Sequence, residues 1–153
     1  MDTFIESYID WLEKLHEEFK KTLADLPPKG LDWSPGEGTN SLAVLGVHIS
    51  GAERYWIGDV VMGDHSERDR QAEFQTVGLA SLALARHLDA SLAYIRKNLA
   101  SLRPEDLDTE RTIPRDQRRV TCIWALLHAL EHTAGHVGHA QLTRQWWDLT
   151  HPK

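Results

Sequence analysis

The sequence has little cysteine, no long apolar run and no excess of basic residues. Cys122 is its single cysteine, which excludes an internal disulfide and leads us to expect a reducing, cytoplasmic location. No apolar run approaches the roughly 18 residues that cross a bilayer, so neither a membrane span nor a membrane partner is predicted. Residues 1–6 lack both a basic start and an apolar stretch, and no secretory signal is predicted.

Basic charge is also scarce relative to acidic charge. Lys and Arg number 17 against 23 Asp and Glu, which leaves a formal net charge of -6. Such a surface repels phosphate backbones, so the balance argues against nucleic-acid binding, and the short basic pair Arg118-Arg119 does not change this. The length of 153 residues and the hydrophobic fraction of 41% are typical of one soluble domain, expected to span residues 1–153.

No strand-like alternation of apolar and polar residues is present, and apolar residues recur instead at helical steps of three and four. Four amphipathic helices are predicted, over about residues 2–25, 42–62, 77–100 and 121–147. Asn40 or Ser41 is expected to cap the second helix, Thr76 the third and Thr121 the fourth. Long polar connectors rich in Gly and Pro separate the helices. The pattern predicts an all-α four-helix bundle, and the connectors are long enough to cross it or to build a pocket at its end.

The side chains best suited to bind a metal form a stripe of histidines on the last predicted helix. Four of the nine histidines of the chain belong to it: His128, His132, His136 and His139. At about 100° per residue, their steps of four and three keep all four rings within roughly an 80° sector. Crowded imidazoles repel one another when charged but can share a cation when neutral. His48, on the core-facing side of the second helix, is the natural ligand from a second helix.

Two histidines at positions i and i+4 can occupy neighbouring corners of a metal polyhedron. A third protein ligand leaves a position open, which is the pattern of a catalytic metal site. Spacing alone leaves three pairs possible, namely 128 with 132, 132 with 136, and 136 with 139. Imidazole suits zinc, nickel, iron and copper, so the ligands do not choose the metal. At least one histidine of the stripe is expected not to be a ligand, and a structural role for all of them is the alternative.

Two short patterns compete with this interpretation. Residues 128–132 match H-x-x-E-H, the inverted zinc-protease signature, in which the glutamate activates water. Glu131, however, lies about 100° around the helix from His132 and so points away from the stripe. Residues Glu13 to His16 match one half of a di-iron E-x-x-H pair, but no second half follows on another core helix.

Three further features each have two interpretations. Cys122 is either a nucleophile or a packing residue at the start of an apolar stretch, and we favour packing. Trp146-Trp147 either mark a ligand or subunit surface or cover the end of the core, and we favour the core. Glu53-Arg54 is either a solvated pair or the edge of the pocket, and the sequence does not decide between them.

Two segments resemble motifs of the DinB-like superfamily. Residues 125–139 are similar to its last-helix motif, which has a His, three residues, a second His and then x-Gly-Gln or x-Gly-His. Residues 45–56 resemble its second-helix motif, and the resemblance extends over about residues 33–144. It implies a four-helix bundle in up-down-down-up order that is often dimeric, so a homodimer is expected.

The resemblance also implies a set of site residues. It places a divalent metal, most often zinc or nickel, on His48, His132 and His136, because the x-Gly that follows His136 fixes the register of the pair. His139 stands where many members have Gln and matches the His of the mycothiol-associated branch, and His128 is left as a flanking residue. Some members resemble transferases or isomerases that use a low-molecular-weight thiol, such as mycothiol, bacillithiol or glutathione.

Three functions follow as hypotheses. The first is a metal-dependent enzyme of thiol-transferase type that acts on a small electrophile, with its pocket at the end of the bundle. The second is a stress-related metal-binding protein without turnover. The third is a metal-dependent hydrolase in which Glu131 or another acid activates water.

Overall fold

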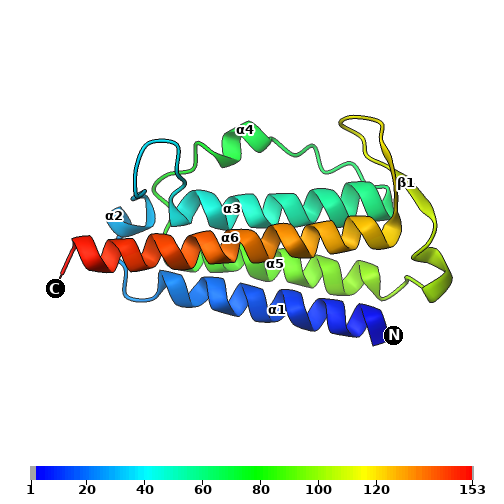
Figure 1. The fold of residues 1–153 in the computed structure, drawn as a ribbon, viewed down its shortest axis with the longest axis horizontal. Helices are drawn as coiled ribbons and strands as arrows, with labels where there is room; N and C mark the ends of the chain where they lie inside the picture. Colours follow the sequence, from blue (N-terminus) through cyan, green and yellow to red (C-terminus); the bar gives the residue numbers. More distant parts are fainter. Residues whose placement is uncertain (1–2, 153) are drawn as a thin grey trace.

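The computed structural model describes residues 3–152, and four long helices that lie side by side dominate it (Figure 1). The four are α1 (Thr3–Leu23), α3 (Leu42–Glu53), α5 (Ser81–Leu99) and α6 (Cys122–Thr150). α3 continues directly into η1, a π-helix over Arg54–Met62, and the two together match the second predicted helix. α1 and α6 run in one direction, whereas α3 and α5 run in the other (Figure 1). The predicted four-helix bundle and its up-down-down-up order are confirmed.

Between η1 and α5 the chain returns along the outside of the bundle. Because α3 and α5 are parallel, residues 63–80 must travel back along the bundle before α5 begins (Figure 1). This return connector carries the short helix α4 (Arg70–Glu73), which packs against α3. A second short helix, α2 (Pro28–Leu31), begins at a proline that suits the first turn of a helix. The long connectors were predicted, but these short helices within them were not.

The predicted helix starts are right at two positions and wrong at a third. The Ser41 hydroxyl accepts a hydrogen bond from the Val44 amide at 3.2 Å, and the Thr121 hydroxyl accepts one from the Trp124 amide at 3.3 Å. Thr76 does not cap α5, which begins at Ser81. Its hydroxyl instead donates to the Glu73 carbonyl at 2.7 Å, and Gly78 at φ +77 holds the chain outside the helical region.

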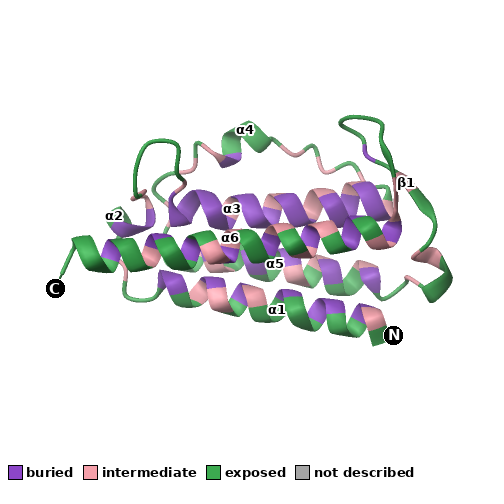
Figure 2. Ribbon diagram, viewed as in Figure 1, coloured by how far each residue is buried: buried purple, intermediate pink, exposed green. Residues whose placement is uncertain are grey.

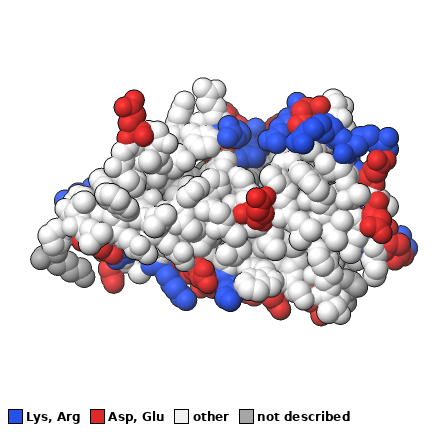
Figure 3. All heavy atoms as spheres, in the orientation of Figure 1, with Lys and Arg blue, Asp and Glu red and all other residues white. Residues whose placement is uncertain are grey.

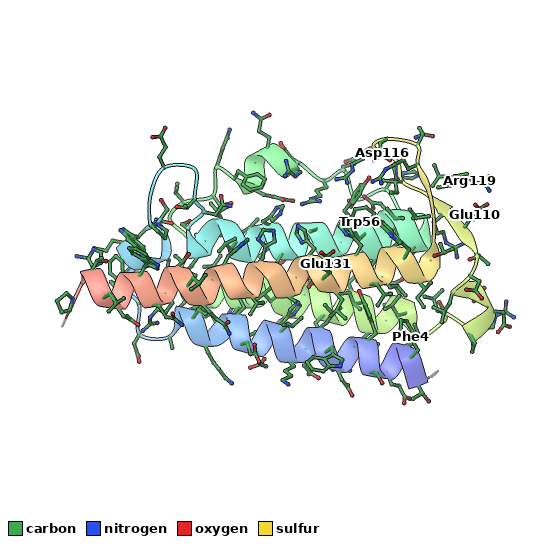
Figure 4. All side chains as sticks on the ribbon, viewed as in Figure 1. Phe4, Trp56, Glu110, Asp116, Arg119 and Glu131 are labelled. Carbon is green, nitrogen blue, oxygen red and sulfur yellow. The ribbon has the colours of Figure 1, made fainter. Side chains whose placement is uncertain are left out.

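A short hairpin precedes α6 and corrects the expectation of no strands. After the 3-10 turn η2 (Pro104–Asp106), β1 (Glu110–Thr112) pairs with β2 (Arg119–Thr121) in antiparallel register, with Arg111 opposite Val120. The side chains of Glu110 and Arg119 form an ion pair within it, and Figure 4 shows both beside the turn. Three-residue strands are too short to produce a readable alternation, which is why the sequence pattern missed them.

Two apolar clusters fill the bundle, one toward each end, and Figure 2 shows buried residues along all four long helices. A polar layer lies between them and takes one buried side chain from each long helix: His16, Glu53, Ser91 and Thr133. On every helix the layer residue stands between a member of one cluster and a member of the other, as His16 does between Leu12 and Phe19. No helix within residues 3–152 is long and apolar enough to span a membrane.

Candidate metal centre

Three histidine side chains from two antiparallel helices meet between α3 and α6. His48 comes from α3, and His132 and His136 come from successive turns of α6. The Nε2 atom of His132 lies 3.2 Å from Nε2 of His48 and 3.2 Å from Nε2 of His136. Within residues 3–152, this is the one group of three or more His, Cys, Asp or Glu side chains placed to share a metal ion, with ligand atoms within 4.8 Å of one another.

The centre lies about midway along α6, not at the end of the bundle where the pocket was expected. His132 and His136 stand well inside Cys122–Thr150, and the return connector reaches the centre from the side. Its Phe74 ring packs against the ring of His48, with centroids 4.8 Å apart. The expectation that connectors contribute to the site holds, but they do so along the length of the bundle because α3 and α5 are parallel.

Two of the three nitrogen–nitrogen separations fit a tetrahedral metal. A zinc ion with Zn–N bonds near 2.05 Å places neighbouring ligand nitrogens about 3.3 Å apart. Both separations from His132 Nε2, at 3.2 Å, are close to this value. Three imidazoles also leave a coordination position for a further ligand, as in catalytic rather than structural sites.

The protonation of two of these rings also suits metal binding. Burial, together with the neighbouring rings of His136 and His48, lowers the pKa of His132 to about 3. Burial likewise lowers the pKa of His136 to about 4, with contributions from His48 and His139. Both rings are therefore neutral at pH 7, and each retains a nitrogen lone pair with which it can bind a cation.

A carboxylate and a guanidinium from the return connector orient His48. Glu73 Oε2 lies 2.8 Å from His48 Nδ1, and Arg68 donates to both oxygens of Glu73, at 2.5 and 2.7 Å. Burial alone would raise the pKa of Glu73, but the hydrogen bonds from Arg68 and His48 outweigh it and hold the pKa below its usual value. Glu73 remains ionised and fixes the proton on Nδ1, which leaves Nε2 of His48 free for a metal.

A glycine makes room for this carboxylate. A Cβ atom at Gly51 would stand 2.1 Å from Oε1 of Glu73, so any larger residue there would displace it. Sequence reasoning did not assign a role to Glu73 or Arg68. Both lie within residues 33–144, over which the superfamily resemblance extends, but in a polar connector to which no site residue was assigned.

The other two histidines of the stripe flank the centre in different ways. His139 Nδ1 lies 3.3 Å from His136 Nδ1, so it can accept the proton that His136 carries on the side away from the centre. His128 stacks on the ring of Trp124, with centroids 5.1 Å apart and planes 13° apart, and meets the edge of Trp56. His128 is thus part of an aromatic wall beside the three clustered rings.

The two competing motifs do not assemble a site. Glu131 lies on the outer face of α6 (Figure 4), with its side chain 81% exposed and 3.4 Å from His128 Nδ1, so it points away from the centre as expected. In the E-x-x-H pattern, His16 is buried, whereas Glu13 is exposed and pairs with Arg96 on α5. Glu13 and His16 therefore share no ligand position.

The structure also decides the three features that had two interpretations. Cys122 is buried in the core, and burial raises the pKa of its thiol, which is the environment of a packing residue. Trp147 is buried and meets Trp33 edge-on, whereas Trp146 is exposed. Of the Glu53-Arg54 pair, Glu53 is 1% exposed and belongs to the polar layer, whereas Arg54 is half-buried and lines a cavity together with Gly51 and Glu73.

Comparisons with known proteins agree with this fold and these motifs. A family model described as mycothiol S-transferase matches residues 8–148. A comparison with curated proteins found no match.

Among solved structures, a conserved protein from Enterococcus faecalis has a TM-score of 0.74 at 20% identity, covering 95% of this chain and 97% of that chain. A DinB-like protein from Bacillus cereus has a TM-score of 0.72 at 17% identity, covering 92% of this chain and 90% of that chain. YfiT from Bacillus subtilis, described as a probable metal-dependent hydrolase with an unusual four-helix bundle topology, has a TM-score of 0.76 at 13% identity, covering 95% and 89%. DinB-like proteins share the fold, and because the family model spans most of the sequence, the chain belongs to the mycothiol S-transferase family.

Proposed function

We propose that the protein binds one divalent metal ion, zinc or nickel, through His48, His132 and His136. With this metal it would transfer a low-molecular-weight thiol to a small electrophile. The observation that carries the proposal is the cluster of three imidazole nitrogens, with two separations of 3.2 Å, in a chain whose family is named for thiol transfer. A divalent cation bound there would favour the thiolate form of a thiol at neutral pH.

The residues around the cluster have defined tasks in this proposal. Glu73 and Arg68 keep His48 in one orientation and one tautomer, and His139 does the same for His136. Phe74 covers one side of the His48 ring and limits the access of water. In the transfer, a sulfur–carbon bond forms while a carbon–halogen bond or an epoxide carbon–oxygen bond breaks. The thiol proton goes to solvent or to the epoxide oxygen.

A hydrolase is the second candidate, because YfiT, which shares the fold, is described as a probable metal-dependent hydrolase. The side chains near the centre favour it less. Glu131 is directed to solvent, and the carboxylate of Glu73 is already held by Arg68 and His48. Within residues 3–152, no Asp or Glu belongs to the group of side chains placed to share a metal ion. Metal binding without turnover is the third candidate.

An activity assay tests the proposal. Metal-loaded and chelator-treated protein would be incubated with mycothiol, bacillithiol or glutathione and with an epoxide or 1-chloro-2,4-dinitrobenzene. We expect metal-dependent conjugation with one of these thiols, and Glu131→Gln should leave the rate within about twofold of wild type because its side chain is exposed. Metal-dependent ester or amide hydrolysis without conjugation would favour the hydrolase, and metal binding without either reaction would favour the third candidate.

Two broader expectations accompany this proposal. We propose that the protein is a homodimer that acts in the cytoplasm on small molecules, without nucleic-acid or membrane partners. The oligomeric state is measured by sedimentation equilibrium of the metal-loaded protein. A monomer at micromolar concentration would contradict the expected dimer without affecting the metal centre, whose three ligands come from a single chain.

A further inference from the structure

A small cavity opens beside the metal centre, toward the C-terminal half of α6. Its volume is about 290 Å³, and residues of the 35–40 loop, of α3 and of α6 line it. Leu45 on α3 and Leu142 and Trp146 on α6 supply its apolar surface. The volume is at the lower end of ordinary small-molecule pockets, ~300–1,000 Å³, and suits a compact molecule with a single ring.

This cavity is joined to the metal centre at its inner end. His139 lines the cavity, and its Nδ1 lies 3.3 Å from Nδ1 of His136. On the opposite helix, Leu45 lines the cavity one turn before His48. A molecule bound in the cavity would therefore have one end within about one helical turn of the metal position.

The lining of the cavity carries no Asp, Glu, Lys or Arg side chain. Besides His139 and the indole of Trp146, its side-chain polar groups are uncharged hydroxyls and an amide, those of Thr39, Thr143 and Asn40. Burying an ionised group here would cost free energy that no opposite charge offsets, whereas an uncharged apolar molecule would gain from burial. The space-filling view agrees, because the surface over this half of α6 shows mostly uncharged atoms (Figure 3).

The opposite side of the centre has a different character. A cavity of about 420 Å³ lies between the return connector and the hairpin, and three arginines, Arg68, Arg70 and Arg115, line it together with acidic residues. Lys and Arg side chains gather along this upper edge in Figure 3. Arg68 joins it to the centre, because its guanidinium lies 3.4 Å from His48 Nδ1. The metal position thus separates a charged side from a neutral side.

We propose that the neutral cavity bounded by Leu45, Leu142 and Trp146 is the binding site for the electrophile, and that this electrophile is a small uncharged molecule carrying one aromatic ring or a short alkyl chain. The assignment rests on the proposed thiol transfer for the identity of the reaction, but the binding of an uncharged ring does not depend on turnover. In the transfer to a chloro-aromatic, the sulfur–carbon bond forms at the ring end nearest His139, chloride leaves, and the thiol proton passes to solvent.

The test compares two charge substitutions on the exposed face of α6. Leu142→Glu places a charge in the cavity, and Leu149→Glu is the matched control two turns later, outside it. Both leucines are exposed, at 55% and 78%, so neither change disturbs the core. The probe is 1-fluoro-3-nitrobenzene, which is uncharged and does not react with thiols, and its binding to the as-purified protein is followed by fluorine NMR titration.

We expect Leu142→Glu to weaken binding of the probe at least tenfold and Leu149→Glu to change it less than twofold. With 1-chloro-2,4-dinitrobenzene as substrate, Leu142→Glu should raise KM for the electrophile at least tenfold and leave KM for the thiol within twofold. Absence of probe binding to the wild type, or equal binding by both variants, would overturn the assignment. If the probe binds as expected but no thiol is transferred, the proposed function fails while the cavity remains a site for uncharged rings.

Discussion

Two buried histidine–glutamate pairs lie in the bundle, and their surroundings differ. A ring nitrogen stands 2.8 Å from a carboxylate oxygen in both, in the pair of His48 with Glu73 and in the pair of His16 with Glu53. Glu53 also accepts hydrogen bonds from Ser91 at 2.5 Å and from Thr133 at 2.9 Å. Its carboxylate thus connects all four long helices.

The second nitrogen of each histidine decides what the pair can do. Nδ1 of His16 is buried without a hydrogen-bond partner among residues 3–152, whereas Nε2 of His48 faces His132 Nε2 at 3.2 Å. The same kind of pair therefore ties helices together in one place and orients a proposed metal ligand in the other. A buried histidine beside a carboxylate does not by itself identify a metal site; the group facing its free nitrogen does.

The largest expected effect is the loss of metal from His132→Ala. The variant removes the ring that lies 3.2 Å from both other nitrogens, and metal content should fall from about one ion per chain to none detectable, because a three-ligand site loses its central member. Elemental analysis and circular dichroism measure metal and helix content. His128→Ala, in the same stripe, should retain the metal, and unchanged metal in His132→Ala would contradict the assignment of ligands.

Glu53→Ala should produce the largest loss of stability. The change leaves the ring of His16 and the hydroxyls of Ser91 and Thr133 without their buried acceptor, and each buried polar group left unsatisfied costs about 1–3 kcal/mol. Urea denaturation measures the free energy of unfolding. Glu13→Ala, which breaks an exposed pair with Arg96, should cost less than about 1 kcal/mol. Equal losses in the two variants would mean that the polar layer does not tie the helices together.

Glu73→Gln should affect metal binding more than stability. The amide cannot hold the proton on His48 Nδ1 as the carboxylate does, so affinity for zinc should fall about 10–100-fold. Titration against a competing chelator measures it. The control is Glu67→Gln, at an exposed position in the same connector, and it should leave the affinity unchanged. A loss in both variants would indicate a general effect of connector charge.

The smallest expected effect is a pH dependence of the metal-free protein. His132 and His136 have their pKa values lowered from 6.5 to about 3 and about 4, so below pH 6.5 the unfolded chain binds protons that the folded chain does not. Stability is therefore retained above pH 6.5 and lost as the pH falls toward these lower values. Urea denaturation at pH 7 and pH 5 should show a smaller loss in His132→Ala than in wild type, and equal losses would contradict the neutral buried rings.

Much of the fold was readable because periodicity is a local property. The spacing of apolar residues placed the four long helices, and side-chain caps such as Ser41 and Thr121 marked two of their starts. Thr76 was wrongly predicted to cap the third helix because a threonine hydroxyl can bond to the backbone equally well at a helix start and in a connector. Gly78, at φ +77, keeps the chain out of the helical conformation after Thr76. The hairpin has strands of three residues each, which is below the length at which a period of two can be recognised.

The candidate site, like the fold, has a part that could be predicted from local spacing and a part that could not. The stripe on α6 followed from spacing, and superfamily resemblance then selected His132 and His136 from it. Glu73 could not be found by spacing, because it lies 25 positions from His48 in a polar connector without periodicity. Glu53 was left undecided because a charged residue on a helix is usually solvated, and its burial depends on side chains from three other helices.

The parallel arrangement of α3 and α5 has a consequence for how the candidate site is built. Neighbouring helices joined head to tail need only short loops, but here a stretch of chain must pass over the outside of the bundle, and that stretch supplies Arg68 and Glu73 to the centre. Its short helix α4 packs against α3, and the rest of the stretch passes over the outside of the bundle (Figure 1). The topology thus divides the candidate site between two parts of the molecule. The three histidines stand on helices that the core holds in place, whereas the side chains that orient His48 come from a connector outside those helices.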